Sequence, residues 1–288
     1  MKRILVTGAT GHLGKGIVEA LLNYVPPQQI VASARDPQQA AGLRKLGVEV
    51  RRADYNDYDS LLAALQGIDK LFLVSAVAFS DRLAQHGNVI RAAEAAGVRH
   101  IVYPSIQRRE GVTAVIDGVT DSDIGTELLL RASGMAYTIV QHPLYAELIP
   151  LLVGERVVRK GLRLPAGEGR IPLTGRRDLA AASAAILAGD GHENTEISLN
   201  AGVSYSMREL ADVYSELLAV PISYTAITPA QYVAERMADG LPASVAGFFG
   251  SWLAAIAAGA FDQPDPALER LLGTPATPLG EVLTAALE

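Results

Sequence analysis

The first 140 residues alternate between short, continuous apolar runs and longer segments whose apolar residues recur three or four positions apart. Continuous apolar runs are typical of strands buried on both faces, and the wider spacing is typical of amphipathic helices. The pattern predicts strands at 4–6, 29–33, 48–50, 70–75, 100–103 and 137–140. Between them it predicts helices at 14–23, 37–46, 57–65, 83–96 and 124–132.

This alternation predicts an α/β fold, a Rossmann-type doubly wound parallel sheet covered by helices on both faces. Asp36 and Asp57 precede two of the helices as expected N-caps, and Gly97 follows another as a C-terminal glycine. Because the rhythm changes after residue 141, we expect a Rossmann domain over residues 1–150, with later segments free to complete its sheet. Residues 151–288 then form a smaller C-terminal α/β region that covers the mouth of the sheet.

The second half of the chain is less regular. We expect helices at 177–187, 206–218, 228–238 and 243–259, and short strands within 156–171 and at 222–226. Asp178 is the expected N-cap of the first of these helices. Residues 243–261 carry no charge over 19 positions, close to the ~20 needed to cross a bilayer. Since Ala, Gly and Ser make up much of this stretch, we expect a buried helix or cleft cover and no membrane partner.

Composition narrows the functional classes. Hydrophobic residues make up 49% of the 288-residue chain and charged residues 19%, which excludes a disordered protein. The net charge is −6 with no basic block, so we expect no nucleic-acid partner. The absence of cysteine excludes disulfides and thiolate chemistry, and the five scattered histidines lack metal-ligand spacing, so we expect no metal site. The N-terminal apolar run is too short for a signal peptide, which favours a cytoplasmic location.

A glycine-rich loop joins the first expected strand to the first helix with the spacing G-x-x-G-x-x-G. Glycines there permit a tight turn, allow a pyrophosphate to approach the backbone and let the helix pack on the strand, while the helix N-terminus attracts the phosphates. In this βαβ context the loop predicts dinucleotide binding. The alternative is a strand–helix turn without a ligand. The predicted binding residues are Gly8, Ala9, Thr10, Gly11, His12, Leu13 and Gly14.

The end of the second expected strand selects the nucleotide. An acid there binds the ribose 2′-hydroxyl of NAD, whereas an arginine accommodates the 2′-phosphate of NADP. Arg35 occupies this region and Ser33 adds a hydroxyl, so we expect NADP(H). In the alternative, Arg35 is solvated and Asp36 serves NAD, but Asp36 precedes Pro37 and is the expected cap of the next helix.

Further cofactor contacts are expected where other strands end, because ligands of such sheets bind beyond the carboxyl ends of the strands. Asp54 either meets the adenine region or leads into the following helix as a cap. Ser75, Ala76 and Val77 are placed to pass near the adenosine ribose and pyrophosphate. No tyrosine is followed by a lysine four residues later, so the Tyr-x-x-x-Lys proton relay of many short-chain dehydrogenases is absent.

Several of these segments together resemble the NmrA-like group of atypical short-chain dehydrogenases. They are the loop 8–14, Arg35, Asp54-Tyr55, Tyr103-Pro104-Ser105 and residues 137–140, with further similarity at 25–30, 191–194 and 271–273. Within the group the chain is most similar to bacterial NADPH:quinone oxidoreductases and triphenylmethane-dye reductases. The resemblance implies a Rossmann domain, a small C-terminal substrate domain and NADPH as cofactor.

The chain departs from this group at two places. Asp123 stands where relatives often carry Lys or His, and Gln141-His142-Pro143 replaces Arg-Asn-Gly after the sixth strand. Tyr145 and Glu147 still fit the pattern. The departures leave cofactor binding intact and the identity of the substrate open.

Reduction of a quinone or cationic dye needs no side-chain acid, since hydride can pass to an electron-poor ring held close by and water can protonate the oxygen. Tyr145 and His142 are candidates to line the substrate pocket and Ser105 to hydrogen-bond nicotinamide or substrate; ordinary loop packing is the alternative for each. Aromatic candidates for its apolar walls, or for the core, are Phe79, Phe248, Phe249 and Trp252.

We therefore expect an NADPH-dependent oxidoreductase, monomeric or homodimeric, that transfers hydride to a small aromatic or quinone-like acceptor. A non-catalytic NADP(H)-binding sensor that regulates a partner protein is the alternative, because fold does not fix function. Reduction or isomerisation in a biosynthetic pathway is a third possibility.

Overall fold

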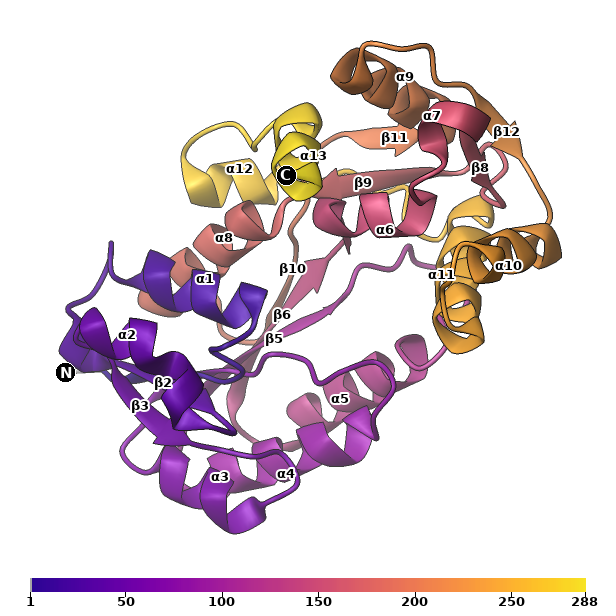
Figure 1. The fold of residues 1–288 in the computed structure, drawn as a ribbon. Coiled ribbons are helices and arrows are strands. Elements are labelled where there is room, and N and C mark those ends of the chain that lie inside the picture. The colour runs from indigo at the N-terminus through magenta and orange to yellow at the C-terminus, as the bar shows by residue number, and fades with distance from the viewer. Residues whose placement is uncertain (1) are drawn as a thin grey trace.

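The computed structural model describes residues 2–288 and is built on a seven-stranded parallel sheet (Figure 1). Its strand order is β10-β6-β5-β4-β1-β2-β3, and the order reverses between β1 and β4. A reversal of this kind opens a crevice at the carboxyl ends of the strands. The strands are β1 (Ile4–Val6), β2 (Ile30–Ala34), β3 (Glu49–Arg52), β4 (Lys70–Phe72), β5 (His100–Ile106), β6 (Ala136–His142) and β10 (Thr195–Ser198).

Helices cover both faces of this sheet, as the alternating pattern predicts (Figure 1). On one face α1 (His12–Leu21) packs against α8 (Arg176–Ala188), which also contacts α12 (Ala267–Leu272). On the other face lie α3 (Tyr58–Leu65), α4 (Arg82–Ala95) and α5 (Thr120–Ala132). Each face has its own apolar core, around Ile17 and Ile186 on the first and around Leu61 and Val89 on the second. The predicted doubly wound Rossmann-type fold is confirmed.

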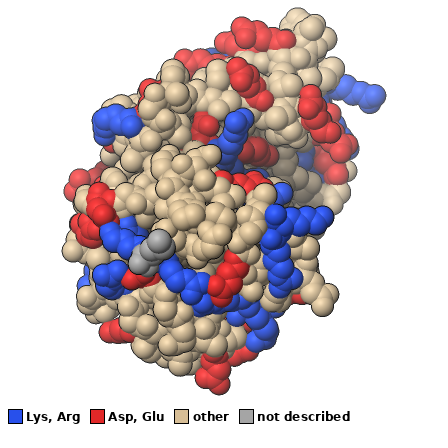
Figure 2. Space-filling model, turned by 90° about the vertical axis from the view of Figure 1, so that its left-hand side faces the viewer, with Lys and Arg blue, Asp and Glu red and all other residues tan. Residues whose placement is uncertain are grey.

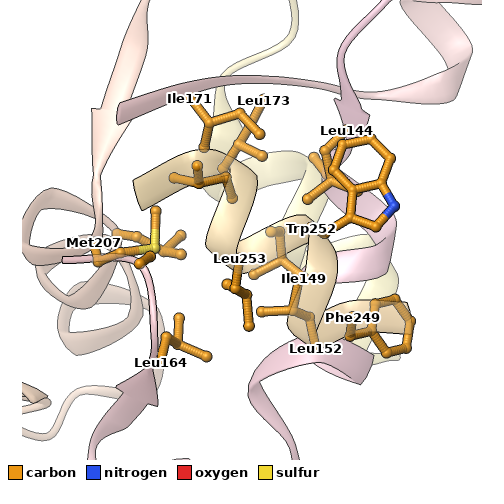
Figure 3. Packing of buried hydrophobic residues seen from close by; sticks show 14 of the residues in the cluster. Leu144, Ile149, Leu152, Leu164, Ile171, Leu173, Met207, Phe249, Trp252 and Leu253 are labelled. Carbon is orange, nitrogen blue, oxygen red and sulfur yellow. The ribbon is translucent and has the colours of Figure 1, made fainter. Parts of the chain in front are cut away.

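The second half of the chain builds a further apolar core beside the sheet. Figure 3 shows Leu144, Ile149 and Leu173 close to Trp252 and Leu253 of α11. Its strands are β7 (Leu144–Tyr145), β9 (Arg170–Thr174) and β11 (Ser204–Ser206) in one sheet, and the pair β8 (Leu162–Leu164) and β12 (Tyr224–Ala226). Its helices are α6 (Ile149–Val153), α7 (Val157–Lys160), α9 (Met207–Leu218), α10 (Pro229–Ala238), α11 (Ala243–Ala257) and α13 (Leu279–Leu287).

Most expected elements are present with shifted ends. Helix α1 starts at residue 12 and α5 at residue 120, both earlier than expected, while β5 and β6 continue to residues 106 and 142. The expected helix 37–46 divides into a 3₁₀ turn (Pro37–Ala40) and α2 (Ala41–Lys45). Other 3₁₀ turns are Pro27–Gln29 and Ala146–Leu148.

The expected caps can be compared with the observed helix ends. The carboxylates of Asp36 and Asp57 accept backbone N–H groups at the starts of their helices, and Gly97 has a positive φ of 78° just after α4. The assignment of Asp178 as a cap is wrong, because α8 begins at residue 176 and Asp178 lies inside its first turn. Its carboxylate instead accepts hydrogen bonds from the backbone N–H and hydroxyl of Thr277.

Later segments complete the Rossmann sheet. Strand β10 pairs in parallel with β6, with Thr195 opposite Thr138. Helix α8, also from the second half of the sequence, covers α1. The division at residue 150 therefore stays a prediction about sequence regions, while the sheet itself draws on both.

The uncharged stretch 243–261 forms α11, a helix of 15 residues whose side chains Phe249, Trp252 and Leu253 are buried. Among residues 2–288 no helix is long and apolar enough to cross a membrane. The expectation of a buried helix at this position is confirmed.

Candidate active site

The glycine loop connects β1 to α1 in the conformation that its spacing predicts. Gly8 has a φ of +56°, and a Cβ on Gly14 would lie 2.5 Å from the Gly8 carbonyl oxygen, so both positions require glycine for backbone reasons. Gly11 is exposed, and a Cβ there would meet only the Gly8 oxygen, at 3.3 Å. No side chain of residues 2–288 caps the N-terminus of α1. The open helix end and the bare Gly11 fit a dinucleotide pyrophosphate.

The residues expected to select the cofactor lie at the carboxyl end of β2. The Arg35 side chain is exposed and has no hydrogen bond or ion pair within the described chain, whereas the Ser33 hydroxyl is buried without a partner among those residues. The Asp36 carboxylate accepts the Gln38 N–H at 2.9 Å, so it is engaged as a cap. Arg35 therefore fits a 2′-phosphate better than Asp36 fits a ribose hydroxyl.

Sequence reasoning missed a second cation near this strand end, Arg52. It ends β3, lies opposite Ala34 in the strand register and bonds the Asp57 carboxylate at 2.8 Å. Figure 2 views the molecule from the side of α1 and β2 and shows Lys and Arg in several groups interspersed with acidic residues. This side of the molecule therefore carries charges of both signs.

Asp54 follows β3, and its carboxylate accepts the N–H of Asn56 at 2.9 Å. The cap of α3 is Asp57, so the interpretation of Asp54 as the helix cap is wrong, and its contact with adenine stays a prediction. The next residue, Tyr55, donates its hydroxyl to the Val74 carbonyl at 2.6 Å and also bonds Thr7. Tyr55 thereby ties together the ends of β1, β3 and β4.

The segment after β4 is held by both β5 and α4. Ser75 donates its hydroxyl to the Pro104 carbonyl at 3.0 Å, and the Ala76 N–H donates to His86 Nε2 at 2.9 Å, while Val77 is exposed. Burial lowers the pKa of His86 to about 3, so its ring is neutral and Nε2 can accept. His86, which sequence reasoning missed, is thus a positioning residue for the predicted cofactor segment.

A cavity of about 370 Å³ lies at the carboxyl ends of β4, β5 and β6. It brings together parts of the chain that are far apart in sequence, including the glycine loop, the three catalytic candidates and α11. Its walls include His12, Leu13, Ser75, Ala76, Arg82, Ser105, Asp123, His142, Tyr145, Arg176 and Trp252. Of the four aromatic candidates only Trp252 lines it. Phe79 and Phe249 instead pack against Phe248, at ring-centre distances of 5.4 and 5.6 Å.

His142 and Tyr145 stand side by side in this cavity, with His142 Nδ1 3.4 Å from the Tyr145 hydroxyl. Burial lowers the pKa of His142 to about 3 and raises that of Tyr145 to about 12. Arg176 lies over the Tyr145 ring at 5.2 Å. Because the pKa of His142 lies far below 7 and that of Tyr145 far above it, neither group exchanges a proton readily near neutral pH, and the pair serves better as a wall that orients a ring.

The third candidate, Ser105, uses its hydroxyl inside the protein. It donates to the buried carboxylate of Glu127, which Arg108 also holds through bonds of 2.7 and 2.9 Å. A hydrogen bond from Ser105 to nicotinamide or substrate stays a prediction. The observed partner shows that the side chain also fixes the end of β5 against α5.

A buried ion pair also lines the cavity. Arg82 Nη2 donates to Asp123 Oδ1 at 2.7 Å, and the Tyr103 hydroxyl donates to the same oxygen at 2.7 Å. The Ile106 N–H donates to Asp123 Oδ2 at 2.9 Å. The acid at position 123 is thus matched by an internal cation, a pairing that the sequence pattern alone could not reveal.

The model of the NmrA-like family matches residues 1–255. The chain belongs to the NmrA-like family. Quinone oxidoreductase 2 of Escherichia coli K12 is 36% identical over 280 residues, which cover 96% of each chain. The NAD(P)H azoreductase of Xenophilus azovorans is 32% identical over 249 residues, covering 84% of this chain and 83% of that one.

Two solved structures of reductases match along nearly the whole chain. The E. coli NADPH-dependent quinone oxidoreductase in complex with NADPH superposes with a TM-score of 0.90 at 33% identity, covering 99% of this chain and 100% of that one. Citrobacter triphenylmethane reductase with NADP(H) gives a TM-score of 0.89 at 30% identity, covering 99% of each. These relatives confirm that the chain is an NAD(P)H-dependent oxidoreductase of the NmrA-like family and that its cofactor is NADPH.

Proposed function

We propose that this NmrA-like protein transfers hydride from NADPH to a quinone-like or dye-like aromatic acceptor held in the cavity. The observation that carries the proposal is the position of the cavity. It opens beside the glycine loop at the carboxyl ends of β4–β6, and its walls combine apolar surface with a few fixed polar groups. Its volume of about 370 Å³ suits a small aromatic molecule.

In this proposal the chain's own residues bind the cofactor and orient the acceptor. Gly11 and the open N-terminus of α1 receive the pyrophosphate, and Arg35 pairs with the 2′-phosphate. The segment 75–77, held by His86, borders the same path. When bound, NADPH supplies the hydride. Trp252 and Tyr145 then hold the acceptor ring from the cavity walls.

Rate enhancement in this proposal comes from proximity and orientation, and water delivers the proton. The chain has no Tyr-x-x-x-Lys pair, and the buried His142 has a pKa of about 3, so it carries no extra proton near neutral pH. Tyr145, with its pKa raised to about 12, is a weak acid. The proposal therefore assigns no side chain as a general acid.

The test is NADPH consumption with a panel of quinones and triphenylmethane dyes, with Gly11→Val as the inactive control. We expect turnover with at least one class of acceptor and none in the control. Tight NADPH binding without turnover of any acceptor would reject the proposal in favour of an NADP(H) sensor. The cytoplasmic location and the monomeric or homodimeric state stay predictions.

A further inference from the structure

Arg82 is the first residue of α4 and is only 6% exposed, yet it lines the cavity. A buried guanidinium is unfavourable unless its N–H groups are hydrogen-bonded. Within residues 2–288 the Arg82 side chain makes a single hydrogen bond, from Nη2 to Asp123. Its Nε is buried and finds no partner in this part of the chain. Because the side chain lines the cavity and only Nη2 is hydrogen-bonded, the guanidinium retains donor capacity there in addition to the buried Nε.

Its partner Asp123 is far better satisfied. The carboxylate accepts bonds from Arg82, the Tyr103 hydroxyl and the Ile106 N–H. A carboxylate offers about four acceptor sites and a guanidinium five donors, so the pair leaves a surplus of donors. Burial raises the pKa of Asp123, and the Arg82 charge together with the donated hydrogen bonds opposes that rise. The geometry is that of an anchored carboxylate that holds Arg82 in place.

The other arginines near the cavity are used differently. Arg108 makes two hydrogen bonds to Glu127, and Arg176 lies over the Tyr145 ring. Arg82 also sits at the N-terminus of the 14-residue helix α4, where the helix dipole adds positive potential. The unused N–H donors of Arg82 and the positive end of the α4 dipole both favour an electron-rich oxygen beside Arg82.

We infer that Arg82 binds an oxygen conjugated to the ring of the acceptor and stabilises the negative charge that this oxygen gains during reduction. The inference rests on the proposed function. In the reaction the acceptor gains a hydride, NADPH is oxidised to NADP⁺, and the acceptor oxygen then takes one proton from water. Arg82 keeps all its protons. A donor fixed beforehand where charge develops lowers the barrier because it needs no reorganisation.

This role distinguishes two kinds of acceptor. A neutral quinone places new negative charge on oxygen, which Arg82 stabilises. A cationic triphenylmethane dye is neutralised by hydride at carbon, so no oxygen gains charge and Arg82 gives no such assistance. Arg82 is thus a specificity-determining residue that favours quinones over cationic dyes.

The test compares acceptors in matched variants. Arg82→Gln alone would leave Asp123 buried and unpaired, so the principal variant is the double substitution Arg82→Gln with Asp123→Asn, which removes both charges and keeps amide hydrogen bonding. Arg91→Gln, an exposed arginine on the same helix, is the control. We expect kcat/KM for naphthoquinone to fall about tenfold to a hundredfold in the double variant, with that for a cationic triphenylmethane dye little changed.

A second readout needs neither NADPH nor turnover. Trp252 is the only tryptophan of the chain and lines the cavity, so its fluorescence reports naphthoquinone binding directly. The double variant should bind naphthoquinone at least about tenfold more weakly, and the Arg91→Gln control should bind it as the wild type does. Circular dichroism of each variant establishes that it is folded.

The outcomes separate the two proposals. Equal losses toward quinone and dye, or unchanged quinone binding and turnover in the folded double variant, would overturn the role of Arg82 and leave the proposed function standing. A wild-type protein that binds NADPH but reduces neither acceptor would overturn the proposed function and this inference with it.

Discussion

Arg35 is a single exposed cation on which the proposed choice of cofactor depends. It has no internal partner among residues 2–288, so its charge is available to the 2′-phosphate that only NADPH carries. Arg35→Ala should weaken NADPH binding about tenfold to a hundredfold and NADH binding much less. Titration of both cofactors measures this, with Asp36→Asn as the control that keeps the NADPH preference. Equal losses for the two cofactors would refute the assignment.

The three catalytic candidates provide the second test at this scale. A positioned general acid contributes ~10²–10⁴-fold, whereas a group that only orients the substrate contributes less. Ser105→Ala, His142→Ala and Tyr145→Phe should each lower single-turnover reduction of a saturating quinone by less than about tenfold. A thousandfold loss for Tyr145→Phe with unchanged NADPH affinity would identify its hydroxyl as an acid.

The buried charges of the site could not be predicted from the sequence. Arg82 and Asp123 each stand one residue before an expected helix, at 83–96 and 124–132, and nothing in their spacing reveals that they meet across α4 and α5. The one available signal was the acid at position 123, which departs from the pattern of the family that the sequence resembles. His86 was equally hidden, because its role depends on the Ala76 N–H that it accepts.

At the scale of elements, the connection from β1 to α1 separates two roles of glycine. A Cβ on Gly14 would collide with the Gly8 oxygen at 2.5 Å, whereas the space above Gly11 is open apart from that oxygen at 3.3 Å. Gly14→Ala should therefore destabilise the fold by about 1–3 kcal/mol, and Gly11→Val should abolish NADPH binding while the fold survives.

Thermal unfolding and NADPH titration of both variants measure these effects. Gly42→Ala is the matched control, because a Cβ at this helical glycine meets nothing within 4 Å and should be neutral or slightly stabilising. Tight NADPH binding by a folded Gly11→Val protein would contradict the proposed role of the loop.

The order and type of the Rossmann elements could be predicted, because buried parallel strands and amphipathic helices have distinct periods. The residues at which elements end were harder to predict. Pro104 favours a strand end at residue 103, since proline is rare inside central strands, yet β5 continues to residue 106. Strand β10 was not predicted, because its four residues Thr195–Ser198 alternate too briefly to stand out.

At the scale of the whole molecule, the cavity is formed by tertiary packing of segments that are distant in sequence. Its walls run from His12 to Trp252, so no local pattern could predict its shape. Tyr145, His142 and Ser105 were found because they lie at or just beyond the carboxyl ends of β5 and β6, which share one edge of the sheet. Residue type alone could not show which aromatic side chain lines the cavity. The packing of the folded chain places Trp252 in the cavity wall and Phe79, Phe248 and Phe249 against one another.

Three buried histidines predict how stability responds to acid. Burial lowers the pKa values of His86, His100 and His142 from 6.5 to about 3, 4 and 3. The unfolded chain takes up these protons below pH 6.5 and the folded protein does not, so their contribution is complete above pH 6.5 and is lost as pH falls toward 4. Denaturant unfolding between pH 8 and pH 5 should show this loss.

His142→Gln should flatten that pH dependence, because it removes one of the three buried rings whose pKa is lowered. The slope itself is the readout, because a merely structural effect of the substitution shifts the curve without changing its dependence on pH. An unchanged slope in His142→Gln would contradict a neutral, buried ring.

Hydride transfer from NADPH to an aromatic acceptor in the cavity is the central claim, and one measurement tests it most directly. NADPH bearing deuterium at nicotinamide C4 is mixed with the wild-type protein and a saturating quinone in a single-turnover experiment. We predict that one NADPH is oxidised per quinone reduced and that deuterium slows the step. Tight NADPH binding without oxidation by any quinone or dye would contradict the account and favour a sensor.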